Sequence, residues 1–289
     1  MKARVAKEDP MDLQIDHVTV AGQELDRLGE SFSQAGLEAE YGGRHSNGVT
    51  HMSVVGFRDG SYLELISTVN PDEESPWWND PIHGDGGPCA WAVRVDDIET
   101  VSADLADRGI IVDGPNQYER VRDDGTLVEW DLTTLGEGEL GSTLPFLISD
   151  RTPRERRVQP TGGLAESPVH GVDTVILGVP DLEAASEEFE TAFEMTDPNR
   201  GDDQRLSATV ASYPDQPVAL VEPQVEGFLA DRIDEFGPLP VVYLLRSDGE
   251  ITSEFSDAVE DSFMGRPVEW LSITDPVGCR YIGVVPGSE

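Results

Sequence analysis

The stretch that decides the fold runs from Gly42 to Ser67 and reads GGRHSNGVTHMSVVGFRDGSYLELIS. Loosely alternating apolar residues predict one strand from Val49 to Phe57, and a second strand is predicted from Tyr62 to Ile66. Between the two strands lies the Asp-Gly pair at positions 59 and 60, which is a strong short-range signal for a hairpin turn. The stretch is therefore expected to form a β-hairpin, and it carries more chemically reactive side chains than any other segment of the chain.

Glu64 is the informative residue of this hairpin, because it lies between Leu63 and Leu65. If the turn has two residues, Val55 lies opposite Glu64, and His51 shares a face with it. A carboxylate in a buried strand must be paired, bound to a metal or neutralised, because an isolated buried charge is very costly. A second interpretation stays open, in which the sheet is half exposed and Glu64 faces water.

The composition is dominated by acidic residues, with 57 Asp and Glu against 20 Lys and Arg and a formal net charge of -37. Such an excess destabilises a compact chain by self-repulsion unless concentrated salt screens it. We therefore expect a cytoplasmic protein of a salt-accumulating halophile. The same charge argues against binding to nucleic acid or to an anionic membrane surface.

Neither cysteines nor apolar runs indicate a special location. Cys89 and Cys279 form no CxxC pair, so the sequence implies neither a zinc ribbon nor a disulfide framework. No apolar run approaches about 18 residues, and the first ten residues lack the apolar centre of a signal peptide. These features favour a soluble, intracellular protein.

The first 70 residues follow the order strand, helix and three strands. Residues 1–11 are polar and are expected to form a tail, and IDHVTV at 15–20 predicts the first strand. Apolar residues at helical spacing predict a helix over 24–35 that ends at Gly36. The hairpin follows this helix.

A loop from Asn70 to Pro88 is rich in Pro, Asp and Gly and contains Trp77, Trp78 and His83. A loop of this length in a compact domain is typical of a lid or a binding loop. The alternative is that both indoles only cover an edge of the sheet.

The strand and helix pattern then begins again. A strand is predicted at 89–95, a helix at 97–108, and further strands at 110–112, 125–133 and 142–149. Residues 151–168 are rich in Arg, Pro, Gly and Ser and form the expected interdomain linker. We expect its four arginines to neutralise nearby carboxylates.

The second half of the chain repeats the first. Residues 172–189 align with 15–32 without a gap, and the VEW sequence at 128–130 recurs at 268–270. Four copies of one βαβββ-like unit therefore account for nearly the whole chain.

Paired βαβββ units of this kind resemble the vicinal oxygen chelate superfamily and its glyoxalase-like branch. The resemblance is carried by IDHVTV (15–20), GGRH (42–45), GVTH (48–51), DGSYLELI (59–66) and LPFLI (144–148). It implies an α+β fold in which four modules pair into two tandem domains with cupped mixed sheets. The expected domains are 12–150, with modules 12–69 and 88–150, and a degenerate second domain at 169–289.

The resemblance also implies a divalent metal on the concave face of the sheet, with His17 and Glu64 as its ligands in the first module. In the second module the corresponding positions are Ala90 and Phe146, which cannot bind a metal. In the second domain, Thr174 takes the position of His17 and Val221 that of Glu64. Without a metal, His17 and Glu64 would serve as a catalytic acid and base pair.

Further polar and aromatic residues are expected to bind a substrate that carries a carboxylate, a carbonyl or an aromatic ring. In the two-residue-turn register, His51 lies about 13 Å along the strand from the level of Glu64, which places it at the rim of the pocket. The substrate-binding candidates are Arg44, His45, His51, Arg120, Arg122 and Trp130.

The sequence leaves two functions open. The first is a glyoxalase-like enzyme of the lyase, isomerase or dioxygenase type that acts on a small oxygenated metabolite in the N-terminal cup. The second is a metal-free protein of the same fold that binds or sequesters a small molecule without catalysis. A small molecule is the expected partner in both, and a homodimer is left open.

Overall fold

The computed structural model describes residues 11–122, 124–248, 259–273 and 281–287. It confirms the βαβββ repeat. The first module consists of β1 (Gln14–Ala21), α1 (Leu25–Gln34), β2 (Glu40–Arg44), β3 (Thr50–Gly56) and β4 (Tyr62–Thr68). The second consists of β5 (Gly87–Arg94), α3 (Ile98–Asp107), β6 (Val112–Val121), β7 (Leu127–Leu135) and β8 (Phe146–Asp150). The short helix α2 (Asn79–His83), which periodicity did not predict, lies between the two modules.

The second half follows the same order as far as it is described; residues 249–258, between the first two strands of the fourth module, lie outside the described residues. The third module consists of β9 (Val169–Gly178), α4 (Leu182–Phe193), β10 (Asn199–Asp203), β11 (Ala208–Ser212) and β12 (Val218–Pro223). Helix α5 (Phe228–Phe236) precedes the fourth module, whose strands are β13 (Leu239–Ser247), β14 (Val259–Phe263), β15 (Arg266–Trp270) and β16 (Ile282–Pro286). The 3-10 turns Arg154–Arg156 and Gly162–Ala165 lie between the two halves.

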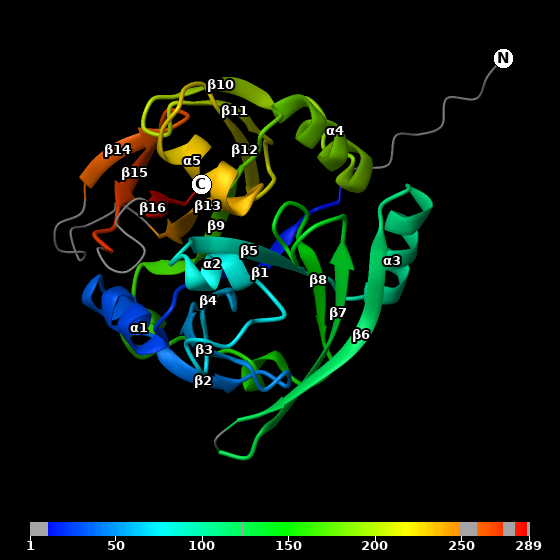
Figure 1. The fold of residues 1–289 in the computed structure, drawn as a ribbon, viewed down its shortest axis with the longest axis vertical. Helices are drawn as coiled ribbons and strands as arrows, with labels where there is room; N and C mark the ends of the chain where they lie inside the picture. The colour runs from blue at the N-terminus through cyan, green and yellow to red at the C-terminus, as the bar shows by residue number, and fades with distance from the viewer. Residues whose placement is uncertain (1–10, 123, 249–258, 274–280, 288–289) are drawn as a thin grey trace.

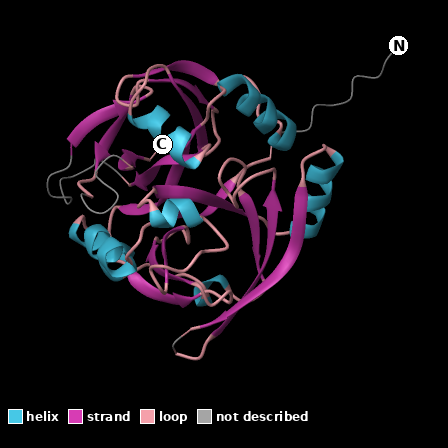
Figure 2. Ribbon diagram, in the orientation of Figure 1, coloured by secondary structure: helices cyan, strands magenta, loops and turns pink. Residues whose placement is uncertain are grey.

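Each half forms one curled, eight-stranded mixed sheet. The strand order of the first is β2-β3-β4-β1-β5-β8-β7-β6, and the second repeats it as β10-β11-β12-β9-β13-β16-β15-β14. In the first sheet, β1 pairs in parallel with β4 and β5 with β8, whereas β1 and β5 are antiparallel. Figure 1 shows the two sheets one above the other, each curled into a cup, and Figure 2 shows the helices around their outer sides. The fold is therefore α+β with two tandem domains, as predicted.

The central strands of the two sheets meet in one shared core. Its fully buried side chains include Val18 and Trp91 from the first sheet and Leu177 and Leu245 from the second. The hydroxyl of Tyr243 on β13 lies 2.8 Å from the main-chain oxygens of Thr19 and Ala90, at the junction between the sheets. The two cups consequently open away from this junction.

The hairpin register differs from the prediction by one residue. Val54 pairs with Glu64 and His51 with Ser67, because the turn contains three residues and not two. Asp59 Oδ1 accepts hydrogen bonds from the main-chain nitrogen and the hydroxyl of Ser61, while Gly60 adopts a φ of 83°. This combination is the three-residue turn with a left-handed glycine. The sequence left both a two-residue and a three-residue turn open, because the Asp-Gly signal indicates the turn but not its length.

The second module contains another difference. The second of its strands was predicted at 110–112, whereas β6 covers ten residues and pairs along β7. Its sequence DGPNQYER carries no apolar alternation, because most side chains of this edge strand are exposed and no buried face requires apolar residues. Among the described residues, no helix combines the length and the apolar character needed to cross a membrane.

Candidate functional site

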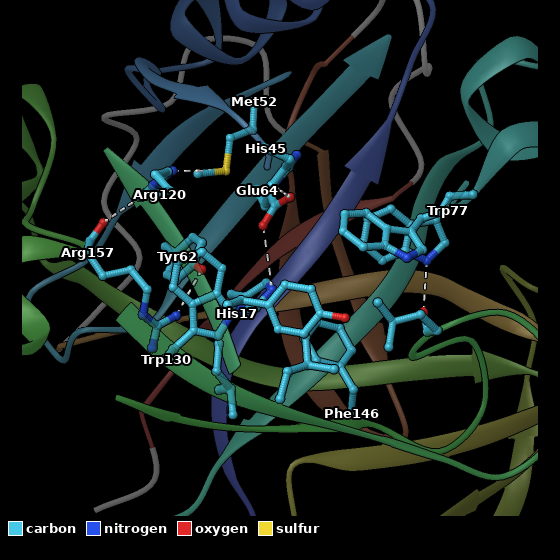
Figure 3. A pocket seen from close by; sticks show the side chains of 15 residues that line it. His17, His45, Met52, Tyr62, Glu64, Trp77, Arg120, Trp130, Phe146 and Arg157 are labelled. Atoms are coloured by element: carbon cyan, nitrogen blue, oxygen red, sulfur yellow. Dashed lines mark hydrogen bonds and ion pairs between the residues drawn. The ribbon is translucent and has the colours of Figure 1, made fainter. Parts of the chain in front are cut away.

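The floor of the first cup carries His17 and Glu64 on the adjacent parallel strands β1 and β4. Both side chains are buried, and Nε2 of His17 lies 3.6 Å from Oε2 of Glu64. The imidazole stacks on the ring of Tyr62 at 4.6 Å between centroids, and the edge of Phe146 meets it at 5.2 Å. The structure thus brings His17 and Glu64 together, and Figure 3 shows them facing each other.

A second imidazole approaches the same carboxylate. Nε2 of His45 lies 3.4 Å from Oε1 of Glu64, and the Nδ1 atom of His45 is 2.9 Å from the hydroxyl of Thr50. Burial pushes the pKa of Glu64 upward, but the hydrogen bond and charge of His45 and the charge of His17 outweigh it, so the pKa lies below its ordinary value. Glu64 is therefore a charged carboxylate at neutral pH, between two imidazoles.

Behind His17 lies a buried ion-pair network. Asp16 is fully buried, and its Oδ1 lies 2.7 Å from Nδ1 of His17. Arg157 donates to both oxygens of Asp16 at 2.7 Å, and Arg154 donates to one of them at 2.5 Å. Burial raises the pKa of Asp16, but the guanidinium of Arg157 more than compensates and holds it well below its usual range. A charged Asp16 thereby fixes the Nδ1 side of His17 and turns Nε2 toward Glu64.

A second carboxylate, that of Asp150, completes the charge balance of Arg154 and Arg157. Arg157 also donates to both oxygens of Asp150, at 2.7 and 2.9 Å, and Arg154 donates to Asp150 at 3.1 Å. Arg151, in the same segment, pairs with Asp131. The prediction that linker arginines neutralise carboxylates is therefore confirmed for these three residues, although Arg157 also lines the cavity, which the sequence did not indicate.

Arg120 on β6 closes the cup from the opposite edge of the sheet. Its Nη1 atom donates to the main-chain oxygen of Gly42 on β2 at 2.9 Å and lies 3.5 Å from the sulfur of Met52. Its Nη2 atom donates to the main-chain oxygen of Arg157 at 3.4 Å. The side chain is buried, with 6% of its surface exposed, and Nε has no hydrogen-bond partner. Burial lowers the pKa of this guanidinium.

The walls of the cavity are aromatic. Tyr118 and Trp130 face each other across β6 and β7 and stack at 6.2 Å, and Trp77 meets Tyr118 edge-on at 6.4 Å. Trp77 also contacts the ring of His45 at 5.8 Å. The tryptophan loop therefore lies where a binding loop would, because both of its indoles line the cavity.

A second connection holds this loop over the cup. The indole nitrogen of Trp78 donates to the main-chain oxygen of Leu140 at 2.8 Å, and its main-chain nitrogen donates to Glu139 at 3.1 Å.

The volume of the cavity is about 60 Å³, several times the roughly 10–15 Å³ that one water requires. The cavity therefore suits a compact ligand. Its lining residues are His17, His45, Met52, Tyr62, Glu64, Trp77, Trp78, Tyr118, Arg120, Trp130, Leu132, Leu140, Phe146, Ile148 and Arg157.

Three predicted substrate-binding residues do not line this cavity. Arg44 is exposed on the edge strand β2. His51 has the opposite orientation to Glu64 because of the three-residue turn, and its ring contacts Tyr41 on the outer side. Arg122 lies beyond the cavity and donates to the main-chain oxygen of Arg156. The expected position of these three residues around the cup was therefore wrong, whereas His45, Arg120 and Trp130 do line it.

Tyr62, Met52, Tyr118 and Arg157 line the cavity but were absent from the predicted site. Tyr62 and Tyr118 lie two residues from Glu64 and Arg120 on their respective strands, so alternation along a strand could have identified both. Arg157 could not be found in this way, because it follows the last strand of the module and reaches back through tertiary contacts alone.

The donor set does not fit a resident divalent metal. Among the described residues, no group of three or more His, Cys, Asp or Glu side chains could hold a metal ion. The second module offers Ala90 and Phe146, and the Phe146 ring fills the space beside His17. Nδ1 of His17 is already bound to Asp16.

The second cup lacks the acid and base pair. Thr174 takes the place of His17, as predicted, but the strand pairing places Ala219 at the position of Glu64. The predicted equivalent, Val221, is wrong by two residues because the β11–β12 hairpin is shorter: Ser212 pairs with Ala219, whereas Val54 pairs with Glu64 in the first module. Thr174 and Ala219 line a wider pocket of about 600 Å³ in this half.

Comparisons with known proteins agree with this architecture. The family model described as the glyoxalase-like domain matches residues 15–193, from β1 to the end of α4. No curated protein shows a significant sequence match to the chain.

Solved structures share the whole arrangement. A hypothetical protein from Staphylococcus aureus superposes with a TM-score of 0.61 at 14% identity, covering 95% of this chain and 100% of that one. A mutant of 4-hydroxymandelate synthase from Streptomyces coelicolor gives 0.58 at 13% identity, over 96% and 93% of the two chains. A fusion of a xylose isomerase-like TIM barrel with 4-hydroxyphenylpyruvate dioxygenase gives 0.54 at 13%, over 100% of this chain and 52% of that one. At these identities the likeness establishes the fold.

Proposed function

Because the chain belongs to the glyoxalase-like domain family, we propose that its N-terminal cup binds a small oxygenated organic metabolite and that Glu64 and His17 move a proton on it. The single observation that carries this proposal is the buried Glu64 carboxylate between Nε2 of His17 and Nε2 of His45 at the floor of an aromatic cavity. A structural role would not require three titratable groups to converge on the one enclosed space.

The chemistry that suits this arrangement is proton abstraction from a carbon next to a carbonyl group. Glu64 takes the proton, the C–H bond breaks, and its electron pair moves into the enolate. Exclusion of water by the tryptophan loop raises the effective basicity of the carboxylate when the ligand is bound, because fewer waters stabilise its charge. Glu64 then passes this proton to Nε2 of His17, whose Nδ1–H is bound to Asp16, and the resulting imidazolium returns it to the carbon of the enolate, which restores both side chains.

The divalent metal that the resemblance implies has no part in this proposal, because the second pair of ligand positions is apolar. If the reaction required a metal, added divalent cations would be needed for activity. The proposal therefore expects the same exchange rate in the presence and absence of a chelator.

Hydrogen–deuterium exchange tests the proposal. Pyruvate and phenylpyruvate are incubated with the protein in D2O, and proton NMR follows the signal of the carbon next to the carbonyl. We expect protein-dependent exchange that falls by about 100-fold or more in Glu64→Gln, since a positioned base contributes roughly 10²–10⁴-fold. Glu99→Gln, at an exposed carboxylate on α3, is the matched control. Exchange that is unchanged in Glu64→Gln would refute the proposal.

A second function is favoured by one observation, the low pKa of Glu64, since a weakly basic carboxylate is better suited to binding than to proton abstraction. In this alternative the cup binds or sequesters the metabolite without turnover. Binding of a 2-oxo acid without any exchange in D2O would support it.

A further inference from the structure

Arg120 is anomalous for a protein of this composition. The chain has 57 carboxylate residues and 20 Lys and Arg residues, so a carboxylate is available to almost any arginine. Nevertheless, no carboxylate of the described residues forms an ion pair with Arg120, although its side chain is 6% exposed. Its three acceptors are neutral: two main-chain oxygens and the sulfur of Met52. A buried guanidinium without a counter-charge is costly, so the fold retains it for a reason other than stability.

The neighbouring charges do not compensate it. Arg154 and Arg157 are balanced by Asp16 and Asp150, which leaves this network neutral. Glu64 is in contact with the two imidazoles and lies beyond ion-pair distance of Arg120. Within the described part of the chain, Arg120 therefore has no carboxylate in contact, although the charge of Glu64 acts on it across the cavity, and its Nε–H group also lacks an acceptor.

The aromatic row defined by Trp77, Tyr118 and Trp130 lies next to this charge. Tyr118 precedes Arg120 by two residues on β6, so the two side chains project from the same face of the strand. Rings in contact with such a row gain stacking or edge-to-face energy in addition to burial. An aromatic row by itself would also suit a cation, but the guanidinium of Arg120 beside the row, without an ion-pair partner in contact among the residues described, favours an anion.

Resting on the function proposed above, we propose that the ligand of this cavity is a compact aromatic monoanion. Its ring packs against the row Trp77, Tyr118 and Trp130, and its carboxylate or phenolate oxygen binds Arg120. A second negative charge on the ligand is disfavoured, because Glu64 already carries one at the floor of the same cavity. The volume of about 60 Å³ is smaller than the roughly 150 Å³ of a cavity that holds benzene, so the ligand has at most a single ring and part of it extends into the open mouth of the cavity.

Three probes of nearly the same size separate charge from aromaticity: benzoate, its neutral amide benzamide, and the saturated anion cyclohexanecarboxylate. Binding is measured by isothermal titration calorimetry and by quenching of tryptophan fluorescence, since Trp77, Trp78 and Trp130 line the cavity. We expect benzoate to bind about tenfold or more tighter than benzamide, because charge-assisted hydrogen bonds are worth roughly 1.5–3 kcal/mol, or about 10–100-fold. Cyclohexanecarboxylate should bind about threefold to tenfold more weakly than benzoate.

Arg120→Met should reduce benzoate affinity to that of benzamide and leave benzamide affinity nearly unchanged. Arg122→Met is the matched control, because it removes a cation two residues along the chain that does not line the cavity. If Arg120→Met does not fold, the comparison of benzoate with benzamide on the unmodified protein decides the same question.

Equal affinity for benzoate and benzamide, or benzoate binding that survives Arg120→Met, would overturn the aromatic-anion proposal while leaving the proposed small-molecule function in place. Absence of binding by all three probes at millimolar concentration overturns the aromatic-anion proposal, and exchange of pyruvate in D2O then shows separately whether the proposed function survives.

Discussion

The Nη2 atom of Arg120 donates a hydrogen bond of 3.4 Å to the main-chain oxygen of Arg157, so two buried guanidiniums lie at one side of the same cavity. Arg157 is bound by the carboxylates of Asp16 and Asp150, whereas Arg120 is bound only by neutral acceptors. The two neighbouring arginines thus have different roles. Arg157 stabilises the fold through its ion pairs with Asp16 and Asp150, whereas Arg120 is proposed to bind the charge of a ligand. The predictions below follow from this division and from the charges around it.

Removing the two arginines should have different effects on stability. Arg157→Met leaves Asp16 buried without its main partner, which should cost about 3–5 kcal/mol of unfolding free energy. Arg120→Met loses hydrogen bonds but also relieves a buried charge, so the loss should be below about 1 kcal/mol. Urea denaturation in the same buffer, without ligand, measures both. Equal losses would contradict the assignment of separate roles.

The stability contributed by Asp16 should depend on pH. Because the folded-state pKa of Asp16 is depressed, this contribution is present above the unfolded-state value of about 3.9 and is lost as pH falls through the folded-state pKa. The difference in Tm between the unmodified protein and Asp16→Asn should therefore be large at pH 7 and shrink progressively below about pH 4. Comparing the two proteins cancels Asp203 and Glu188, whose raised pKa values act in the opposite direction. A difference that does not change with pH would contradict this mechanism.

Salt should stabilise the protein. The net charge of -37 repels itself over a Debye length of about 10 Å at 0.1 M salt, which falls to about 3 Å at 1 M. We therefore expect Tm to rise steadily as KCl increases from 0.1 M toward molar concentrations, with potassium sulfate at equal ionic strength acting as a control for ion type. A constant Tm over this range would show that the surface tolerates its charge without screening.

Phe146 should be the residue that keeps the cup free of a metal. Its ring contacts His17, and it occupies the position where the second module would contribute a ligand. Phe146→His adds an imidazole beside His17 to the donors His17, His45 and Glu64, so zinc or nickel should bind more tightly by about tenfold or more, as measured by calorimetric titration. The double variant Phe146→His with His17→Ala should lose this gain. Stoichiometric metal in the unmodified protein, measured by mass spectrometry, would contradict the assignment.

The repeat and the charged pair could be obtained from the sequence. The gapless match of 172–189 to 15–32 fixed the modules, because βαβββ units share one apolar pattern. Glu64 between Leu63 and Leu65, together with His17 on the first strand, identified the floor of the cup before any contact was known. Local periodicity indicates to which strand, and to which face of that strand, a residue belongs. This is enough to bring His17 and Glu64 together, because their strands β1 and β4 are neighbours in the sheet.

Tertiary structure decided the rest. The Asp-Gly turn could have two or three residues, and only packing selected the register that turns His51 away from Glu64. The cup closes because Arg120 on one edge strand reaches Gly42 on the other, and Arg157 returns from beyond the last strand of the module. Neither contact has a signature in the sequence, because both join residues more than 75 positions apart along the chain to their partners. The sequence by itself determined the modules and the placement of His17 and Glu64 on the first and last strands of one module, whereas the burial of Arg120 among neutral acceptors was set by long-range packing.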